Sequence, residues 1–252
     1  MELSIIVLTC NQRAYTVRLL ETMIPYLSRY SSTELILIDN ASTDGTLDAV
    51  RTMDLPHNQI TLLSNERNLG VAAARNIGLK RAKGDLLLIL DNDTEVTVEA
   101  IRGLVEYMAD NPNCGLSAPA LRSLSGEIQL SAKPFPGLGI KINHVLRRGS
   151  VSVAERDAMS SRHPLYVIGA CQMIRRKTIE TVGLLDDRIF YGPEDADFCM
   201  RVAASGFTVD YVPSLSIVHH WQRATSRSPF SRLSLLHIRA LIYFYIKHRR
   251  LI

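Results

Sequence analysis

The chain has 252 residues, of which 46% are hydrophobic and 21% charged, and its formal net charge at pH 7 is +4. This length and composition are typical of a globular protein with one large domain or two small ones around a substantial core. The positive excess is too small to indicate a nucleic acid partner, and we exclude that class of function.

The four cysteines are far apart and form no Cys-x-x-Cys pair, so the sequence predicts neither a zinc site nor a disulfide framework. The N-terminus enters a strand-like run without a basic leader, and no apolar run approaches the roughly 20 residues of a membrane span. We therefore expect reduced thiols, no signal peptide, no transmembrane helix and a cytoplasmic location.

Strand-like apolar runs alternate with helical periodicity through the first 95 residues. The expected strands cover residues 3–8, 34–39, 60–63 and 86–90, and the expected helices between them cover residues 17–27, 46–53 and 71–82. Repeated strand–helix units predict an α/β fold with a largely parallel sheet and right-handed crossovers.

The regularity weakens after residue 114, although further elements are indicated. We expect helices over 98–110, 176–182, 194–204 and 230–250, and strands near 115–121, 126–131, 164–174, 208–212 and 217–220. Residues 115–165 are rich in Gly, Pro and Ser and include an irregular loop through 147–149. We expect acceptor recognition there, because loops carry specificity.

Polar side chains follow each of the first four strands: Thr9 and Asn11, Asp39, Asn65, then Asp91 and Asp93. The carboxyl ends of parallel strands share one edge of a sheet, which is where ligands bind in open α/β folds. A ligand that touches all of these positions has the size of a nucleotide.

Asp91 and Asp93 come directly after a run of five apolar residues, the pattern of a strand buried on both faces. Two carboxylates at this spacing suit a hard divalent cation such as Mg²⁺ or Mn²⁺, which commonly shares its oxygen ligands with a phosphate. The alternative is a polar turn that leaves the strand, since Asp and Asn favour turns.

Five motifs in order carry a resemblance to a known family: SIIVLTCN at 4–11, IDNASTDG at 38–45, NERNLGVAAARNIG at 65–78, DND at 91–93 and FYGPEDAD at 190–197. Together they resemble the inverting family 2 glycosyltransferases of the GT-A fold, and among these the bacterial rhamnosyltransferase-like branch. The resemblance covers about residues 3–225. It implies a Rossmann-like, mostly parallel central sheet flanked by helices, with a nucleotide-sugar-binding half (1–114) and an acceptor-binding half (115–225).

The resemblance also implies roles at the donor side. Asp93 is expected to bind Mn²⁺ or Mg²⁺ bridging the donor diphosphate, and Asp91, next to Asn92, to face the ribose or a metal-bound water. The base and ribose are expected to contact Thr9, Asn11 and Asp39. The nucleotide pocket is expected to be closed by Asn68, Gly70 and Arg75. The alternatives are a turn-capping role for Asp39, a surface position for Arg75, and a purely conformational role for the glycine.

At the acceptor side, the resemblance implies that Asp195 is the general base of a single inverting displacement and that Glu194 orients the acceptor. The alternative is that these acids complement the helix dipole, as expected for Asp197, which can also pair with Arg201. Relatives place a metal-binding histidine near His219 and His220. We expect His219 to be the ligand.

The C-terminal segment, residues 226–252, is predicted to be a basic amphipathic helix. No acidic residue follows Asp210, while the same stretch contains seven Lys and Arg residues. Such a helix can lie on an anionic membrane surface, at the inner face of the plasma membrane. The alternative is packing on its own domain or on the second subunit of a homodimer.

The sequence thus predicts a metal-dependent inverting glycosyltransferase that takes a nucleoside-diphosphate sugar, with rhamnose as the expected sugar. The acceptor is a cell-surface glycan or lipid-linked saccharide. The alternatives are a non-catalytic nucleotide-sugar-binding protein and a phosphatase of the haloacid dehalogenase type. Glu95 departs from the Thr or Val usual in that phosphatase motif. A P-loop NTPase is excluded because GxxxxGK[ST] does not occur.

Overall fold

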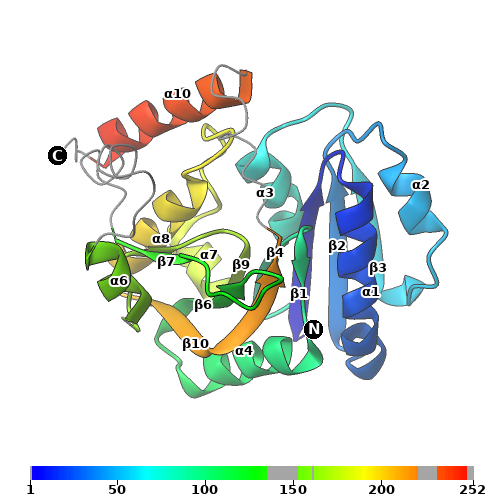
Figure 1. Ribbon diagram of the computed structural model, residues 1–252, viewed down its shortest axis with the longest axis horizontal. Helices are drawn as coiled ribbons and strands as arrows, with labels where there is room; N and C mark the ends of the chain where they lie inside the picture. Colours follow the sequence, from blue (N-terminus) through cyan, green and yellow to red (C-terminus); the bar gives the residue numbers. More distant parts are fainter. Residues whose placement is uncertain (1, 135–152, 161, 221–231, 249–252) are drawn as a thin grey trace.

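The computed structural model describes residues 2–134, 153–160, 162–220 and 232–248. An eight-stranded sheet forms its centre, with helices on both faces (Figure 1). The strands in sheet order are β3 (Ile60–Ser64), β2 (Thr33–Asp39), β1 (Leu3–Thr9), β4 (Leu86–Asp91), β9 (Cys171–Arg175), β6 (Cys114–Arg122), β10 (Thr208–His219) and β5 (Thr94–Glu95). A separate two-stranded sheet joins β7 (Ala132–Lys133) to β8 (Tyr166–Val167).

The four strands predicted before residue 95 pair in parallel, because each is followed by a helical crossover that returns the chain to the same end of the sheet. β1 lies between β2 and β4, with Thr9 opposite Asp39 and Leu8 opposite Asp91. The polar residues that follow the strands therefore meet at one edge, as predicted.

Each face of the sheet has its own apolar core. The helices of the described residues are α1 (Arg13–Arg29), α2 (Thr46–Arg51), the 3-10 turn η1 (His57–Gln59), α3 (Val71–Arg81), α4 (Val98–Asp110), α6 (Val153–Ser160), α7 (Arg176–Val182), α8 (Glu194–Ala204) and α10 (Arg232–Lys247). Helices α1 and α4 pack on one face, and α3, α8 and α10 contribute to the cluster on the other. This arrangement confirms the predicted α/β class and the mostly parallel sheet flanked by helices.

The second half of the sheet is mixed. β9 is antiparallel to both β4 and β6, while β10 runs parallel to β6. The predicted strand over 164–174 is wrong as one element, because the chain turns at 168–170 between β8 and β9. The predicted strand over 126–131 is also wrong: only an isolated bridge joins Arg122 to Ile128. The two predicted strands after 208 form one strand, β10, whose register to β6 shifts between Val212 and Ser216.

The C-terminal helix packs on the rest of the chain through its inner face. Phe244 is fully buried, and Tyr245 and Ala240 are nearly so. Packing on its own domain, the alternative stated above, therefore holds for this face. The flanking residues 226–231 and 249–252 of the predicted helix, and the loop predicted through 147–149, lie outside the described residues.

In the part of the chain that the structure describes, we find no helix with the length and apolar character needed to span a bilayer.

Candidate active site

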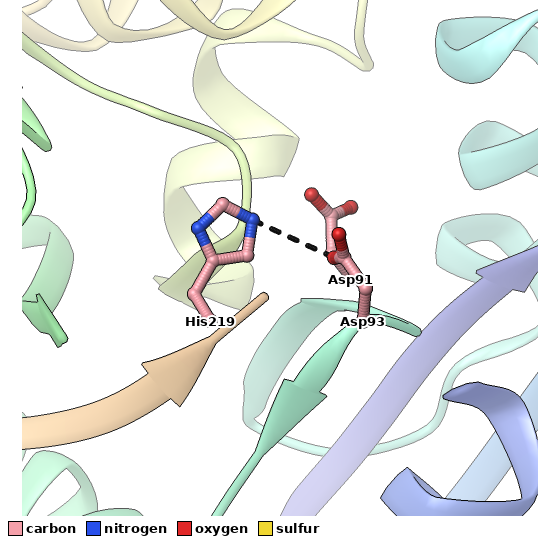
Figure 2. Close-up of side chains that lie close together, drawn as sticks. All are labelled: Asp91, Asp93 and His219. Carbon is pink, nitrogen blue, oxygen red and sulfur yellow. Dashed lines mark ion pairs between the residues drawn. The ribbon is translucent and has the colours of Figure 1, made fainter. Parts of the chain in front are cut away.

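Asp91, Asp93 and His219 point toward one another at the carboxyl edge of the sheet (Figure 2). Asp91 ends β4, Asp93 lies in the following turn, and His219 is the last residue of β10. One ligand atom from each lies within 4.8 Å of the other two, and His219 Nε2 is 3.5 Å from Asp93 Oδ1. Two segments more than 120 residues apart thus contribute to one cluster.

Gln129 determines which nitrogen of His219 faces the carboxylates. The Gln129 side-chain amide donates to the His219 carbonyl oxygen, and its Oε1 lies 2.7 Å from His219 Nδ1. Because an amide oxygen only accepts, Nδ1 carries the proton, and in the neutral ring Nε2 has the lone pair. A lone pair aimed at Asp93 Oδ1 calls for a cation between them. The oxygen, oxygen and nitrogen donors therefore fit a divalent ion such as Mn²⁺.

His220 is directed elsewhere. Its Nε2 lies 2.7 Å from Glu95 Oε1, and its ring packs edge-on against Tyr15 with a centroid distance of 5.1 Å. Of the two neighbouring histidines, the structure brings His219 to the acidic pair.

A buried network of polar side chains holds the turn from Asp91 to Asp93 in place. Asn92 donates to the hydroxyls of Thr9 and Thr16, which also bond to each other at 2.7 Å. The predicted nucleotide contacts Thr9 and Asn92 thus have their side chains engaged inside the protein. Their observed contacts join the acidic turn to β1 and α1.

The loops after β1 and β2 are joined by side-chain caps. Asn11 has a left-handed backbone (φ 53°), and its side-chain oxygen accepts from the Thr43 N–H at 2.7 Å. Asp39 is buried, and its Oδ2 accepts from the Ser42 N–H. Asp39 Oδ1 is also buried, and no described residue forms a hydrogen bond with it. A ligand hydroxyl or N–H would satisfy it, since an unpaired buried acceptor is costly.

Asn68 and Gly70 shape the loop before α3. Asn68 Oδ1 accepts from the Gly70 N–H and from the Asn40 side chain, both at 2.9 Å. Gly70 has φ +85°, and a Cβ there would lie 2.6 Å from the carbonyl oxygen of Phe190. This close approach brings the loop of the first half against the segment that precedes α8.

Arg75 lies between the two acidic centres and is only 4% exposed, so the alternative of a surface position is wrong. Its guanidinium forms a close ion pair with Asp91, lies 3.5 Å from Glu194 and donates to the Gly169 carbonyl oxygen. Arg75 is one of the buried residues of α3. The arginine thus connects the end of β4 to the start of α8.

Glu194 and Asp195 open α8 directly after Pro193. Asp195 accepts backbone N–H bonds from Gly169 at 3.1 Å and from Ala196 at 2.7 Å. Glu194 Oε2 is buried and has no hydrogen-bond partner among the residues that the structure describes. Burial raises the pKa of both carboxyls, and for Glu194 the neighbouring Asp195 adds to the effect. A raised pKa strengthens a carboxylate as a proton acceptor.

Asp197 points away from this pair. It is fully buried and bonds Arg201 at 2.9 Å, as predicted, and it also contacts Lys247 and His248 near the end of α10. Its contacts are structural and attach α10 to α8.

Two site components were not found from the sequence. Gln129 lies in a segment without clear periodicity, and Gly169 contributes only backbone atoms, so no side-chain pattern marks either position. Both become apparent only when their contacts with His219, Asp195 and Arg75 are seen.

Known proteins resemble this chain in sequence. The N-acetylglucosaminyl-diphospho-decaprenol L-rhamnosyltransferase of Mycobacterium tuberculosis is 28% identical over 85% of this chain and 75% of that protein. The dTDP-rhamnosyl transferase RfbF of Shigella flexneri is 26% identical, over 73% of this chain and 59% of that protein.

Solved structures share the fold. The mannosyltransferase PcManGT from Pyrobaculum calidifontis, in complex with GDP-Man and Mn²⁺, superimposes with a TM-score of 0.65 at 22% identity, over 88% of this chain and 58% of that one. GalNAc-T7 with UDP, GalNAc and Mn²⁺ gives a TM-score of 0.68 at 20% identity, over 88% of this chain and 44% of that one. The chain therefore spans roughly half of each of these two structures, which share its GT-A fold.

The sequence model of glycosyl transferase family 2 matches residues 4–183, a stretch that includes the acidic turn, Arg75 and Gly169. The family match, the fold and the rhamnosyltransferases among the relatives of this chain agree with one another. The chain therefore belongs to glycosyl transferase family 2 and is a glycosyltransferase.

Proposed function

We propose that this protein is a divalent-metal-dependent, inverting rhamnosyltransferase. It transfers the sugar of a nucleoside-diphosphate rhamnose to a hydroxyl group of a lipid-linked saccharide. The observation that carries the proposal is the placement of two acidic centres at one edge of the sheet. The Asp91–Asp93–His219 cluster and the Glu194–Asp195 pair are connected through the buried Arg75.

The donor side is proposed to lie in residues 1–114, with His219 contributed from the second half of the chain. Asp93, His219 and Asp91 would hold Mn²⁺ or Mg²⁺, which neutralises charge on the diphosphate leaving group. The unpaired Asp39 Oδ1 is available for a ribose hydroxyl or a base N–H, and Asn11 and Asn68 shape the surrounding loops.

The acceptor side is proposed to lie in residues 115–225, of which 135–152, 161 and 221–225 are outside the described residues. Asp195 takes the proton of the acceptor hydroxyl while that oxygen forms a bond to the anomeric carbon. The bond from that carbon to the diphosphate breaks on the opposite face, so one displacement inverts the configuration. Gly169 and Ala196 hold the Asp195 carboxylate in place, and Glu194 orients the acceptor.

The identity of the sugar and acceptor is supported by the named relatives, one a dTDP-rhamnosyl transferase and one that acts with a decaprenol-linked compound. The cytoplasm is the proposed location, in line with four free cysteines. Membership of a glycosyltransferase family removes the phosphatase alternative.

Thermal unfolding in the presence of dTDP, UDP, GDP and their sugars, with and without Mn²⁺, tests the donor site. Ligand at about 100 times its Kd stabilises the folded state by about 2.7 kcal/mol. For a chain of this size that corresponds to a Tm increase of about 5–10 °C. We expect the increase with dTDP-rhamnose and Mn²⁺, and its loss in Asp93→Asn.

Transfer of radiolabelled rhamnose to a membrane extract then tests the reaction.

A Tm that responds to no nucleotide in either metal condition would contradict the proposed donor site. A metal-dependent increase with UDP or GDP compounds alone would keep the site and reject dTDP-rhamnose as the donor.

A further inference from the structure

Helix α10 has a second, outer face covered by aliphatic side chains. Ala240, Phe244 and Tyr245 are buried on the inner face. Four large aliphatic residues have exposed fractions between 51% and 66%: Leu235, Ile238, Ile242 and Ile246. Their spacings of three and four residues place them in one stripe along the helix. We call these four residues the outer stripe.

The outer stripe is unusual for this molecule. Among the described residues, only two other large hydrophobic side chains are exposed to this degree, Leu124 and Ile128, and both lie near the turn after β6. Single exposed apolar side chains are normal, whereas a contiguous row marks a surface that contacts another apolar phase.

The charge around the stripe indicates which apolar phase it contacts. Arg239 is exposed within the same turns of the helix, and the sequence beyond Asp210 contains Lys and Arg but no Asp or Glu. Positive charge beside an apolar stripe is complementary to a bilayer with anionic headgroups. A second copy docked through the same face would bring two cationic segments together, which opposes association.

The inner face of α10 contacts the segment that directly precedes Glu194 and Asp195. His237 Nδ1 lies 3.1 Å from the carbonyl oxygens of both Tyr191 and Gly192, so it donates to them as an N–H. Near the other end of the helix, Lys247 bonds Asp186 at 2.8 Å and also contacts Asp197 of α8. Figure 1 shows α10 at the periphery of the molecule, on the side of α8.

We propose that the outer stripe of α10 lies in the interfacial region of an anionic bilayer, and that the inner face thereby holds the Glu194–Asp195 segment beside the membrane surface. A lipid-linked acceptor presents its saccharide at that surface. The use of this placement in catalysis rests on the proposed function, whereas the contact between α10 and lipid does not.

Co-sedimentation with vesicles tests the contact. The full-length protein is mixed with two kinds of vesicle, without nucleotide or acceptor. Neutral vesicles contain phosphatidylcholine alone, and anionic vesicles also contain a substantial fraction of phosphatidylglycerol. We expect binding to the anionic vesicles, reduced about tenfold or more in Ile238→Ser/Ile242→Ser. Arg239→Gln is expected to weaken binding to anionic vesicles by about fivefold and to leave binding to neutral vesicles unchanged. The matched control is Leu124→Ser, which removes a large hydrophobic side chain that is 70% exposed elsewhere and is expected to bind as the unaltered protein does.

Equal sedimentation of the unaltered protein and the double variant would overturn the proposal. So would sedimentation equilibrium showing a dimer that Ile238→Ser/Ile242→Ser converts to a monomer, because the stripe would then bind a second copy. Circular dichroism verifies that each variant is folded. Vesicle binding by a protein that shows no nucleotide-dependent Tm increase would reject the proposed function and retain the lipid contact.

Discussion

Gln129 and His219 are joined by two hydrogen bonds of 2.7 Å, although they lie 90 residues apart in the sequence. One bond fixes the backbone at the end of β10, and the other fixes the proton on Nδ1 of the ring. The histidine is thereby oriented with Nε2 toward Asp93. A residue that bonds the ring nitrogen facing away from a metal affects how strongly the histidine binds that metal.

Gln129→Ala is expected to lower the affinity for Mn²⁺ by about 10- to 100-fold, because His219 loses its fixed tautomer and orientation. Electron paramagnetic resonance of free Mn²⁺ measures this without donor or acceptor. Gln59→Ala is the control, since Gln59 is a buried glutamine whose side-chain amide donates to the backbone carbonyls of Tyr30 and Thr33. Equal Mn²⁺ affinity in Gln129→Ala and the unaltered protein would show that Gln129 does not position the ligand.

Asp195→Asn is expected to lower kcat by about 10²- to 10⁴-fold while the KM for the nucleotide sugar is retained, because a carboxamide cannot accept the acceptor's proton. Steady-state kinetics with varied donor separates the two parameters. Glu194→Gln is the comparison, because it alters the adjacent carboxylate. If Glu194→Gln loses more kcat than Asp195→Asn, the two acids have their roles exchanged.

Gly70→Ala is expected to lower the unfolding free energy by more than the strain of its backbone conformation alone. The strain of a side chain at φ +85° costs about 1–3 kcal/mol, and the Cβ would also collide with Phe190. Gly183→Ala isolates the first cost, because Gly183 has φ +81° and no described atom lies within 4 Å of a Cβ built there. Urea unfolding measures both, and equal losses of unfolding free energy would show that the contact with Phe190 relaxes freely.

Asp197→Asn is expected to lower the unfolding free energy at pH 7 by about 3 kcal/mol, because Asp197 is a fully buried carboxylate between α8 and α10. Burial favours the neutral carboxyl, but hydrogen bonds from Lys247, His248 and Arg201 outweigh burial and hold the pKa of Asp197 below its ordinary value. A carboxyl with a lowered pKa in the folded state stabilises that state at pH values above its unfolded pKa of about 3.9. This stabilisation is lost as the pH falls through the pKa of the folded state.

The difference in unfolding free energy between Asp197→Asn and the unaltered protein should therefore be constant above about pH 5 and shrink below about pH 4. Denaturant unfolding across pH 3–7 measures it. Asp48→Asn, which alters a side chain 84% exposed on α2, is the control and should differ little from the unaltered protein. A difference that stays the same down to pH 3 would contradict the assignment of the charge contribution to Asp197.

The order of elements up to β4 was predictable because it depends on local pattern. Unbroken apolar runs in β1, β2 and β4 indicate strands buried on both faces, and the helical periodicity between them indicates crossovers. The elements over 126–131 and 164–174 were predicted wrongly. The backbone there is arranged by contacts with distant segments: the Gln129 N–H donates to the Leu121 carbonyl, and the Ile168 N–H to the Ser131 carbonyl.

The sequence by itself determined the parallel half of the sheet formed by β1, β2, β3 and β4, the position of Asp91 and Asp93 at its edge, and the family, because strand period and residue spacing are local properties of the chain. Only the tertiary structure decided that Arg75 is buried between the two acidic centres, that Gln129 orients His219, and that α10 has one packed and one exposed apolar face. These relationships depend on which distant segments come into contact, and contact is set by the packing of the whole core rather than by neighbouring residues.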